Sequence, residues 1–306
     1  MSLGTILRPV LVSALLPVIS HSQSRPVRPV RARPQIVVSH IPAGPVSGSP
    51  CLFRIQSSPP LKQLAGEFLG RRVFFNFDAS TGTWYGLAGA GIETLPGEHP
   101  LILESTLLTG SRFSSVHSIT IDRARYPSIK LTVPSRFTEP DDAAKARIRE
   151  ERAIKNAAFR RVSSDRFWSG RFSSPVAPSP LVEEVVTEPF GVARTFNGIR
   201  QSIHQGLDFR AATGTPVAAM NHGWVLLARE MFYEGGFLVI DHGQGLLSLF
   251  MHLSRIDVRE GEKVAQGQIV ALSGENGRAT GPHLHAGIRW QGLYIDPAML
   301  MRLELP

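Results

Sequence analysis

The sequence predicts a mainly β protein in which two β domains are joined by one basic helix. Twenty-three prolines and 28 glycines favour short strands and turns over long helices. A length of 306 residues allows two domains, and an apolar content of 42% is ordinary for a globular protein. The β-rich runs fall into two groups, and a charged segment of strong helix formers separates them.

The first residues match a secretory signal. Arg8 precedes the apolar run PVLVSALLPVI, and small residues follow at the positions that a signal peptidase reads. The run is too short to span a bilayer, and no later run reaches the length of a span. We expect residues 1–22 to be a signal peptide and the mature chain to have no stable membrane span. The expected location is the periplasm or cell envelope, or outside the cell; an apolar tail is the alternative.

The composition also limits the partners. Residues 23–35 alternate Pro and Arg, which predicts an extended, solvated arm. The formal net charge of +8 suits an anionic surrounding such as cell wall. Nucleic acid is excluded as the expected partner, because no zinc-finger spacing, aromatic-basic RNA-binding pattern or basic recognition helix occurs. Cys51 is the one cysteine, so it forms no intrachain disulfide and is expected to be buried.

Residues 36–135 are expected to form an accessory β sandwich. Short β-rich runs alternate there with turn-forming residues, which is the spacing of such a domain. No ligands or catalytic pairs cluster in it, so binding, spacing or positioning is the expected role. The runs are QIVVSHI, CLFRI, RRVFFNF, TWYGLAG, HPLILESTLL, HSITI and SIKLTV.

Residues 136–184 are expected to form a basic helix and a Ser/Pro-rich linker. The helix is predicted to start with Thr138 as its cap, and with Pro140 and Asp141 in its first turn. From Ala144 to Phe172 there are nine Lys/Arg and three Asp/Glu, a net charge of 9 − 3 = +6. A solvated connecting helix is one interpretation; contact with acidic wall polymer or with a catalytic groove is the other.

Residues 185–306 return to a β pattern and contain the residues that could support catalysis. His204 and Asp208 lie in HQGLDF, His252 in LFMHLS, and His283 and His285 in HLHAGI. Residues i and i+2 of a strand project from the same face, so the last pair points to one side while Leu284 points into the core. Two imidazoles directed at one point are costly as packing but suit a cation.

A catalytic zinc site needs three protein ligands and one open position. His204, Asp208 and one histidine of the His-Leu-His pair supply such a set. Two histidines then remain, one to take a proton from the attacking water and one to stabilise the oxyanion or protonate the leaving amine.

With these motifs, the chain from about Thr187 to Met299 resembles the lysostaphin/LytM-type zinc metalloendopeptidases, which cut peptide cross-links of bacterial peptidoglycan. The resemblance implies their duplicated hybrid motif fold, a compact antiparallel β sandwich with a groove for an extended peptide. It implies Zn²⁺ on His204, Asp208 and His285. It also implies His252 and His283 as the catalytic residues, with the choice of general base open.

Two positions depart from the family pattern. The family often has Tyr two residues before the catalytic histidine, where this chain has Phe250. The usual FGYR segment is altered, so either Arg194 or Arg200 is the counterpart of its arginine. Two conformational predictions accompany the motifs: Gly206 should allow close packing of backbone at the metal, and Gly281-Pro282 should set the turn before the histidine pair.

The other histidines are expected to be structural or at the surface, His242 in a hairpin turn. Asn221 and Arg289 are weaker candidates for contact with a substrate. The residues expected to be structural are His40, His99, His117, His222 and His242.

The sequence therefore predicts an exported, monomeric zinc metalloendopeptidase that hydrolyses peptide bonds in peptidoglycan stem peptides or cross-links. One alternative is a non-catalytic module of the same fold that binds wall or activates another hydrolase. Another is a metallopeptidase of similar geometry that acts on a secreted protein or peptide. The bond that is cut, and whether the helix and the accessory domain cover the groove, stay open.

Overall fold

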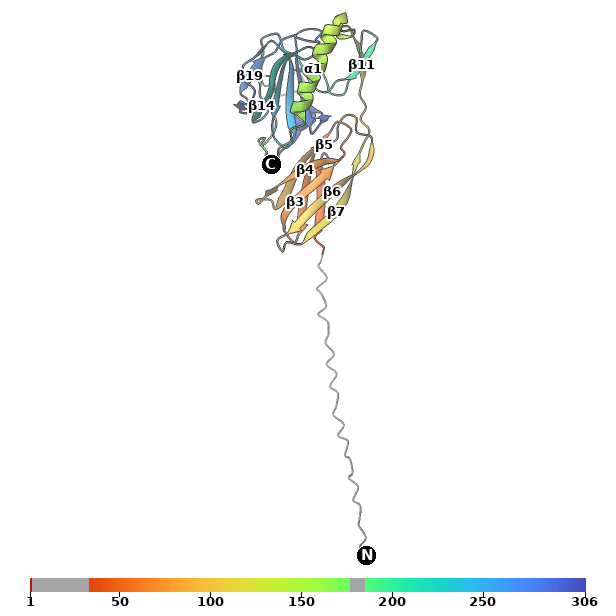
Figure 1. Cartoon of the computed structure of the whole chain (residues 1–306), viewed down its shortest axis with the longest axis vertical. Helices are drawn as coiled ribbons and strands as arrows, with labels where there is room; N and C mark the ends of the chain where they lie inside the picture. The colour runs from red at the N-terminus through yellow and green to blue at the C-terminus, as the bar shows by residue number, and fades with distance from the viewer. Residues whose placement is uncertain (2–32, 177–184) are drawn as a thin grey trace. The chain divides into compact units, whose positions relative to one another are not determined.

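The computed structural model describes residue 1 and residues 33–176 and 185–306. The expected signal peptide, most of the Pro/Arg-rich arm and the end of the linker lie outside these ranges. Residues 34–306 form one compact unit, and the fold is mainly β, as predicted (Figure 1). Within the described ranges, no helix has the length and apolar character needed to cross a bilayer.

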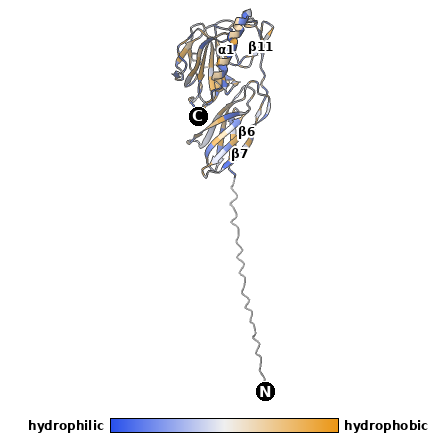
Figure 2. Ribbon diagram, viewed as in Figure 1, coloured by the Kyte–Doolittle hydropathy of each residue, from blue (hydrophilic) through white to orange (hydrophobic). Residues whose placement is uncertain are grey.

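The accessory strands form one continuous antiparallel sheet in the order β1-β2-β5-β4-β3-β6-β7. Buried and exposed residues alternate along β6 and β7, and both colours appear on them in Figure 2. The strands are β1 (Gln35–Ile41), β2 (Pro50–Ser58), β3 (Leu61–Phe68), β4 (Arg71–Asp78), β5 (Thr83–Gly89), β6 (Gly97–Leu107) and β7 (Arg112–Ile121).

This sheet folds over at β4, whose residues 71–74 pair with β3 and whose residues 75–78 pair with β5, and it thereby forms the two layers of the predicted sandwich. Phe53 on β2 and Phe68 on β3 are three strands apart, a separation of ~14 Å in a flat sheet. Their ring centroids lie only 5.2 Å apart, so β2 and β3 face each other across the core. Cys51 is fully buried, as predicted, and burial raises its thiol pKa to about 12.

The run SIKLTV was expected in the accessory domain but belongs to a different sheet. It forms β8 (Ser128–Leu131), which pairs in parallel with β10 (Ala193–Phe196). The other edge of β10 pairs with β11 (Arg200–Ile203). This short run thus extends a hairpin of the C-terminal half.

The basic helix α1 (Asp142–Phe159) starts three residues later than the sequence suggested. Asp141 is the N-cap, and its carboxylate accepts the Ala144 N–H at 2.8 Å. The prediction of Thr138 as the cap was wrong: Thr138 ends the 3₁₀ turn η1 (Ser135–Phe137). Pro140 disfavours helical backbone at the residue before it, so the helix begins only beyond the proline.

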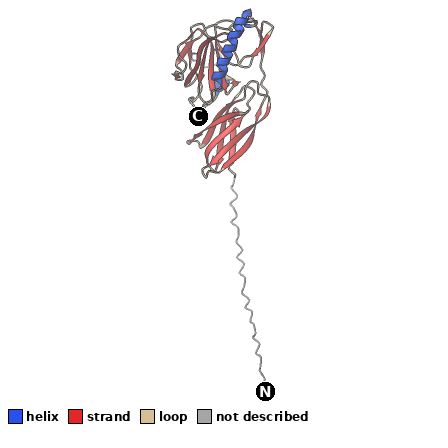
Figure 3. Cartoon of the chain, viewed as in Figure 1, coloured by secondary structure: helices blue, strands red, loops and turns tan. Residues whose placement is uncertain are grey.

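One face of α1 packs on the C-terminal sheet (Figure 1). Figure 3 shows this long helix in blue beside the red strands. Ala158 is buried there with Leu227 and Leu249. Two turns earlier on the same face, the carboxylate of Glu151 accepts the Phe232 backbone N–H. The helix is therefore fixed to the sheet that bears the histidine motifs, which a freely solvated connector would not be.

The main C-terminal sheet has the strand order β18-β14-β15-β16-β20-β12-β9, with β21 paired to β20. Its strands are β9 (Val186–Glu188), β12 (Leu207–Phe209), β14 (Gly223–Met231), β15 (Gly235–Asp241), β16 (Leu246–Leu253), β18 (Lys263–Val264), β20 (Leu284–Trp290) and β21 (Leu293–Ile295). A smaller sheet holds β13 (Pro216–Ala218), β19 (Ile269–Leu272) and β17 (Arg255–Ile256), and α3 (Pro297–Arg302) ends the chain.

Candidate metal centre

Strand pairing brings the two halves of the predicted metal site together. β12 lies antiparallel to β20 with Asp208 directly opposite His285. His204 lies just before β12 and is buried, as are Asp208 and His285. Leu284 points into the core with no exposed surface, as the alternation predicted.

Three ligand atoms converge in this pocket. The His204 Nε2 and Asp208 Oδ1 atoms are 3.0 Å apart, and His285 Nδ1 lies 2.8 Å from the same oxygen. The two imidazole nitrogens are 3.0 Å from each other. Among the described residues, this is the one group of His, Cys, Asp or Glu side chains close enough to share a metal ion.

The hydrogen bonds of His204 show why this cluster fits a cation. Its Nδ1 lies 2.7 Å from the Pro189 carbonyl oxygen, which can only accept, so Nδ1 carries the proton. In the neutral ring Nε2 then has a lone pair, directed at a carboxylate oxygen and at a second imidazole nitrogen. Lone pairs that face each other in a buried site are unfavourable unless a cation lies between them. The donor set of two imidazoles and one carboxylate suits zinc.

His252 and His283, the two predicted catalytic residues, lie beside this cluster. Their ring centroids are 4.7 Å apart, and the His252 ring is 6.3 Å from that of His285. His252 Nδ1 lies 2.7 Å from the Asn276 carbonyl oxygen, and His283 Nδ1 lies 2.8 Å from that of Gly281. Each Nδ1 is therefore the donor, which leaves the Nε2 lone pair free for proton transfer.

The backbone of His252 is held in an unusual conformation. Its φ of +64° lies in the left-handed region, which a non-glycine residue rarely adopts. The backbone N–H donates to the Glu234 carbonyl oxygen at 2.7 Å, and the Asn276 side chain donates to the next residue, Leu253, at 2.9 Å. Such strain persists only where the surroundings impose it, and it is concentrated at functional sites.

Arg194 is a second partner of Asp208 that sequence reasoning left undecided. Its guanidinium pairs with Asp208 Oδ2 and, at 2.5 Å, with Glu188 Oε1. Oδ1 is thereby the oxygen that faces the imidazoles. Arg194 is thus the arginine at the site, and nothing is described of the Arg200 side chain. Glu188, in TEPFG, was missed because one acidic residue at the end of a short strand carries no distinguishing pattern.

Burial and neighbouring charges shift the ionisation of the site. Burial alone would raise the pKa of Asp208, but the facing imidazoles His204 and His285 hold it well below its ordinary value. Burial lowers the pKa of His252 to about 3 and that of His285 to about 4. Both rings therefore stay neutral near pH 7, the state in which imidazole binds a metal or takes up a proton.

Gly206 packs as closely against the site as predicted. A Cβ atom there would lie 2.6 Å from His285 Nε2 and 2.6 Å from the Ala286 carbonyl oxygen, neither of which can move without disturbing β20. Phe250, where the family often has Tyr, is fully buried and contributes packing. Gly281 and Pro282 precede His283, which forms an isolated bridge with Gly274 just before β20.

The remaining candidates lie outside this cluster. His242 is fully buried in the turn between β15 and β16. Asn221 is also fully buried and exchanges two hydrogen bonds with the backbone of Ser169, so its amide is used structurally. The histidines that bond to nearby backbone or side-chain groups instead are His40, His99, His117 and His222.

A cavity of about 300 Å³ opens next to the cluster. His204, His252 and His285 line it on one side, and Lys155 of α1 lines it on another. Lys155 forms an ion pair with Glu234 across the cavity wall. The basic helix thus reaches the cavity beside the candidate metal centre, in line with the second of the two interpretations given for it from the sequence.

Comparison with known proteins agrees with this geometry. Residues 202–297 match the model of peptidase family M23. Peptidoglycan DD-endopeptidase ShyA of Vibrio cholerae is 37% identical over 149 residues, which are 49% of this chain and 30% of that protein. DD-carboxypeptidase/endopeptidase Mpg of Neisseria meningitidis is 34% identical over 118 residues, 39% of this chain and 27% of that protein. The matches therefore span less than a third of these relatives.

A crystal structure from Pseudomonas aeruginosa, assigned to peptidase M23, is similar over most of the chain. It is 28% identical with a TM-score of 0.57, and the match covers 84% of this chain and 94% of that one. The likeness to LytM-type peptidases is thereby confirmed, and the structural match reaches well beyond the C-terminal third.

Proposed function

We propose that this chain, whose residues 202–297 match peptidase family M23, is a zinc-dependent endopeptidase. Its substrate would be the peptide bonds of peptidoglycan stem peptides or cross-links. The observation that carries the proposal is the convergence of His204, Asp208 and His285 beside two histidines with free Nε2 atoms. A non-catalytic module needs neither the three converging metal ligands nor the two histidines beside them.

His204, Asp208 and His285 would hold the zinc. When bound, the ion polarises a carbonyl and provides a nucleophile from water at neutral pH. Arg194 orients Asp208 through Oδ2, and the Pro189 carbonyl fixes the His204 ring. These neighbours keep the ligands in place before any ion binds, which lowers the cost of forming the site.

His252 and His283 would carry the protons. One Nε2 accepts the proton of the attacking water, and the other ring donates to the developing oxyanion or to the leaving amine. Both rings are held through Nδ1 by backbone carbonyls, so neither has to reorient during the reaction. The hydrogen-bonded, left-handed backbone of His252 also helps to keep its ring in one orientation.

Two observations support the cell wall as the substrate. The relatives that match include a peptidoglycan DD-endopeptidase and a DD-carboxypeptidase/endopeptidase. The net charge of +8 also suits an anionic polymer. We place the protein in the cell envelope as a monomer, exported by its first 22 residues. Cell fractionation with and without residues 1–22 tests the export.

Digestion of purified sacculi tests the function. The full chain should release peptide-cleaved muropeptides that mass spectrometry detects, and a chelator or His285→Ala should abolish them. The matched control is His222→Ala, a histidine outside the cluster, which should cut like the unaltered chain. Equal muropeptide profiles from the unaltered chain and His285→Ala would refute the proposal.

A further inference from the structure

The catalytic cavity does not end at the zinc ligands. A second cavity of about 260 Å³ continues from it between α1 and the sheet and reaches Arg289 on β20. The two cavities have five lining residues in common, so they adjoin, and we call the pair of them the groove. The shared residues are Lys155, Glu234, Leu249, Met251 and Tyr294.

The groove follows one strand. His285, Gly287 and Arg289 alternate along β20 and so lie on the same face. Met251 and Leu249 pair with the first two of these from β16. Four residues of strand span ~14 Å, the length of about four residues of extended peptide. Gly287 has no side chain to obstruct the path from the metal site to Arg289.

Arg289 ends this groove with hydrogen-bond donors that no other residue of the described ranges uses. Its guanidinium lies between the rings of Phe159 and Tyr294, 4.3 and 5.4 Å from their centroids. Nε and Nη1 are buried and have no hydrogen-bond partner among the described residues. A buried charged donor without an acceptor is unfavourable, and in a native structure it points to a missing water, ion or ligand.

One carboxylate lines the same cavity as Arg289, that of Glu234, and no ion pair joins the two among the described residues. Glu234, the acidic residue of the groove, is paired with Lys155. Arg71 lies near enough to add a like charge, and its own hydrogen bonds go to the carbonyl oxygens of Gln291 and Leu69. Burial, with Arg71 as a lesser cause, lowers the Arg289 pKa. An anion from outside would relieve both the missing acceptor and the repulsion.

We propose that Arg289 binds a carboxylate of the substrate peptide, in the groove beyond His285. The proposal rests on the proposed function, because it concerns the substrate of the same site. A planar guanidinium can bind a carboxylate through two parallel hydrogen bonds, and the flanking rings hold it in place before the substrate arrives. Arg289 is thus a specificity-determining residue for acidic peptides.

A merely structural role for Arg289 makes a different prediction. If the guanidinium only braces α1 through Phe159, its loss would lower stability and slow every substrate alike. If it binds a carboxylate, its loss would matter only for substrates that carry one. The charge of the substrate therefore separates the two roles.

The test uses the zinc-loaded full chain and two substrates: a purified cross-linked muropeptide dimer, and the same dimer with its carboxylates converted to carboxamides. Arg289→Gln should raise KM for the carboxylate dimer at least ~10-fold, or ~1.4 kcal/mol, with kcat changed little. It should leave KM for the amidated dimer unchanged. Arg289→Lys should restore binding only in part, because an ammonium binds as a point charge.

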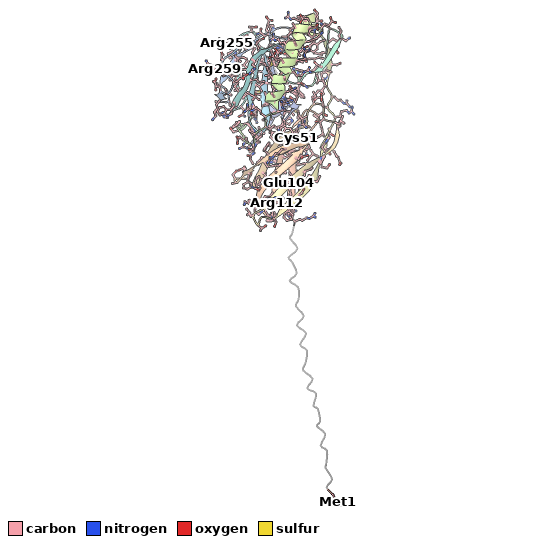
Figure 4. The ribbon with its side chains drawn as sticks, in the orientation of Figure 1. Met1, Cys51, Glu104, Arg112, Arg255 and Arg259 are labelled. Atoms are coloured by element: carbon pink, nitrogen blue, oxygen red, sulfur yellow. The ribbon has the colours of Figure 1, made fainter. Side chains whose placement is uncertain are left out.

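Arg259→Gln is the matched control, because Arg259 is exposed at the margin of the C-terminal strands (Figure 4). It should behave like the unaltered chain with both dimers, and zinc content and melting temperature should match in all variants. An equal effect of Arg289→Gln on the two dimers, or no effect on either, overturns this inference while the proposed function stands. If the unaltered chain cuts neither dimer, both proposals fail.

Discussion

Two groups of buried histidines in the C-terminal half resemble each other in burial and differ in their hydrogen bonds. His242 is fully buried, with Nδ1 2.8 Å from the His222 carbonyl oxygen and Nε2 2.9 Å from the Ser248 hydroxyl. A carbonyl accepts and a hydroxyl can donate, so the neutral ring is fully satisfied. His204 has a carbonyl on one side only, and its other nitrogen faces a carboxylate.

The difference teaches that burial does not identify a metal ligand. Burial lowers the pKa of both His242 and His285 to about 4. What separates the two groups is the partner of the second ring nitrogen, a hydroxyl in one case and a converging set of acceptors in the other. The convergence of two imidazole nitrogens and a carboxylate oxygen, not a perturbed pKa, is the feature that points to zinc.

The largest expected effect comes from exchanging a ligand. His204→Ala should lose bound zinc and lower the rate of wall digestion at least ~10³-fold, because a catalytic metal contributes several kcal/mol. His242→Gln, at the satisfied histidine, should keep one zinc per chain and near-normal activity. Zinc analysis and muropeptide release measure both. If the two variants lost zinc equally, the contrast between the histidine groups would be wrong.

Exchanging a proton carrier should have the next largest effect. His252→Ala and His283→Ala should each lower kcat ~10²–10⁴-fold, the range for general acid–base catalysis, with zinc retained. Steady-state kinetics and zinc analysis on the same samples check this. Loss of zinc in either variant would move that residue from the catalytic set to the ligand set.

Removing the metal should destabilise the folded chain. An ion at 1,000 times its dissociation constant adds ~4 kcal/mol to the free energy of unfolding. Chelation should therefore lower the melting temperature of the unaltered chain and of His242→Gln, but not that of His204→Ala. A melting temperature that does not respond to chelator in the unaltered chain would argue against a bound metal.

Lowering the pH should reduce the free energy of unfolding through His242, the histidine whose ring nitrogens are both hydrogen-bonded. The folded pKa of His242 is about 4 and its ordinary value is 6.5, so the unfolded chain binds the extra proton between these values. Stability is then complete above about pH 6.5 and falls as the pH drops toward 4, by ~3 kcal/mol in all. Denaturant titrations should show a smaller loss over this window in His242→Gln than in the unaltered chain. Parallel losses would show that His242 does not contribute.

The smallest effect is expected at Ser248. Ser248→Ala leaves the buried His242 Nε2 without its hydroxyl partner, at a cost of ~1–2 kcal/mol in the free energy of unfolding. Zinc content and KM should not change. A loss of zinc in this variant would mean that the two histidine groups are coupled, which their separate partners do not indicate.

Much of the site could be predicted from sequence, because its chemistry is carried by residue types at short spacings. His283 and His285 share a face through strand alternation, and His204 and Asp208 come in one short motif. The curated and structural matches agree with the LytM-type resemblance that these motifs carry.

Long-range geometry could not be predicted in the same way. The choice between Arg194 and Arg200 depends on which side chain reaches Asp208, and the groove to Arg289 depends on where α1 docks. The shifted helix start reflects a competition between two good caps, Thr138 and Asp141, which a proline decides. Likewise, SIKLTV has the propensity of a strand, but propensity does not specify its sheet.

The most direct test of the metal centre is X-ray absorption at the zinc edge on the zinc-loaded full chain. Two imidazole nitrogens at ~2.0–2.1 Å and one carboxylate oxygen are expected as protein ligands. Four imidazoles would place His252 and His283 on the metal and leave no residue to move protons, which would contradict the proposed roles.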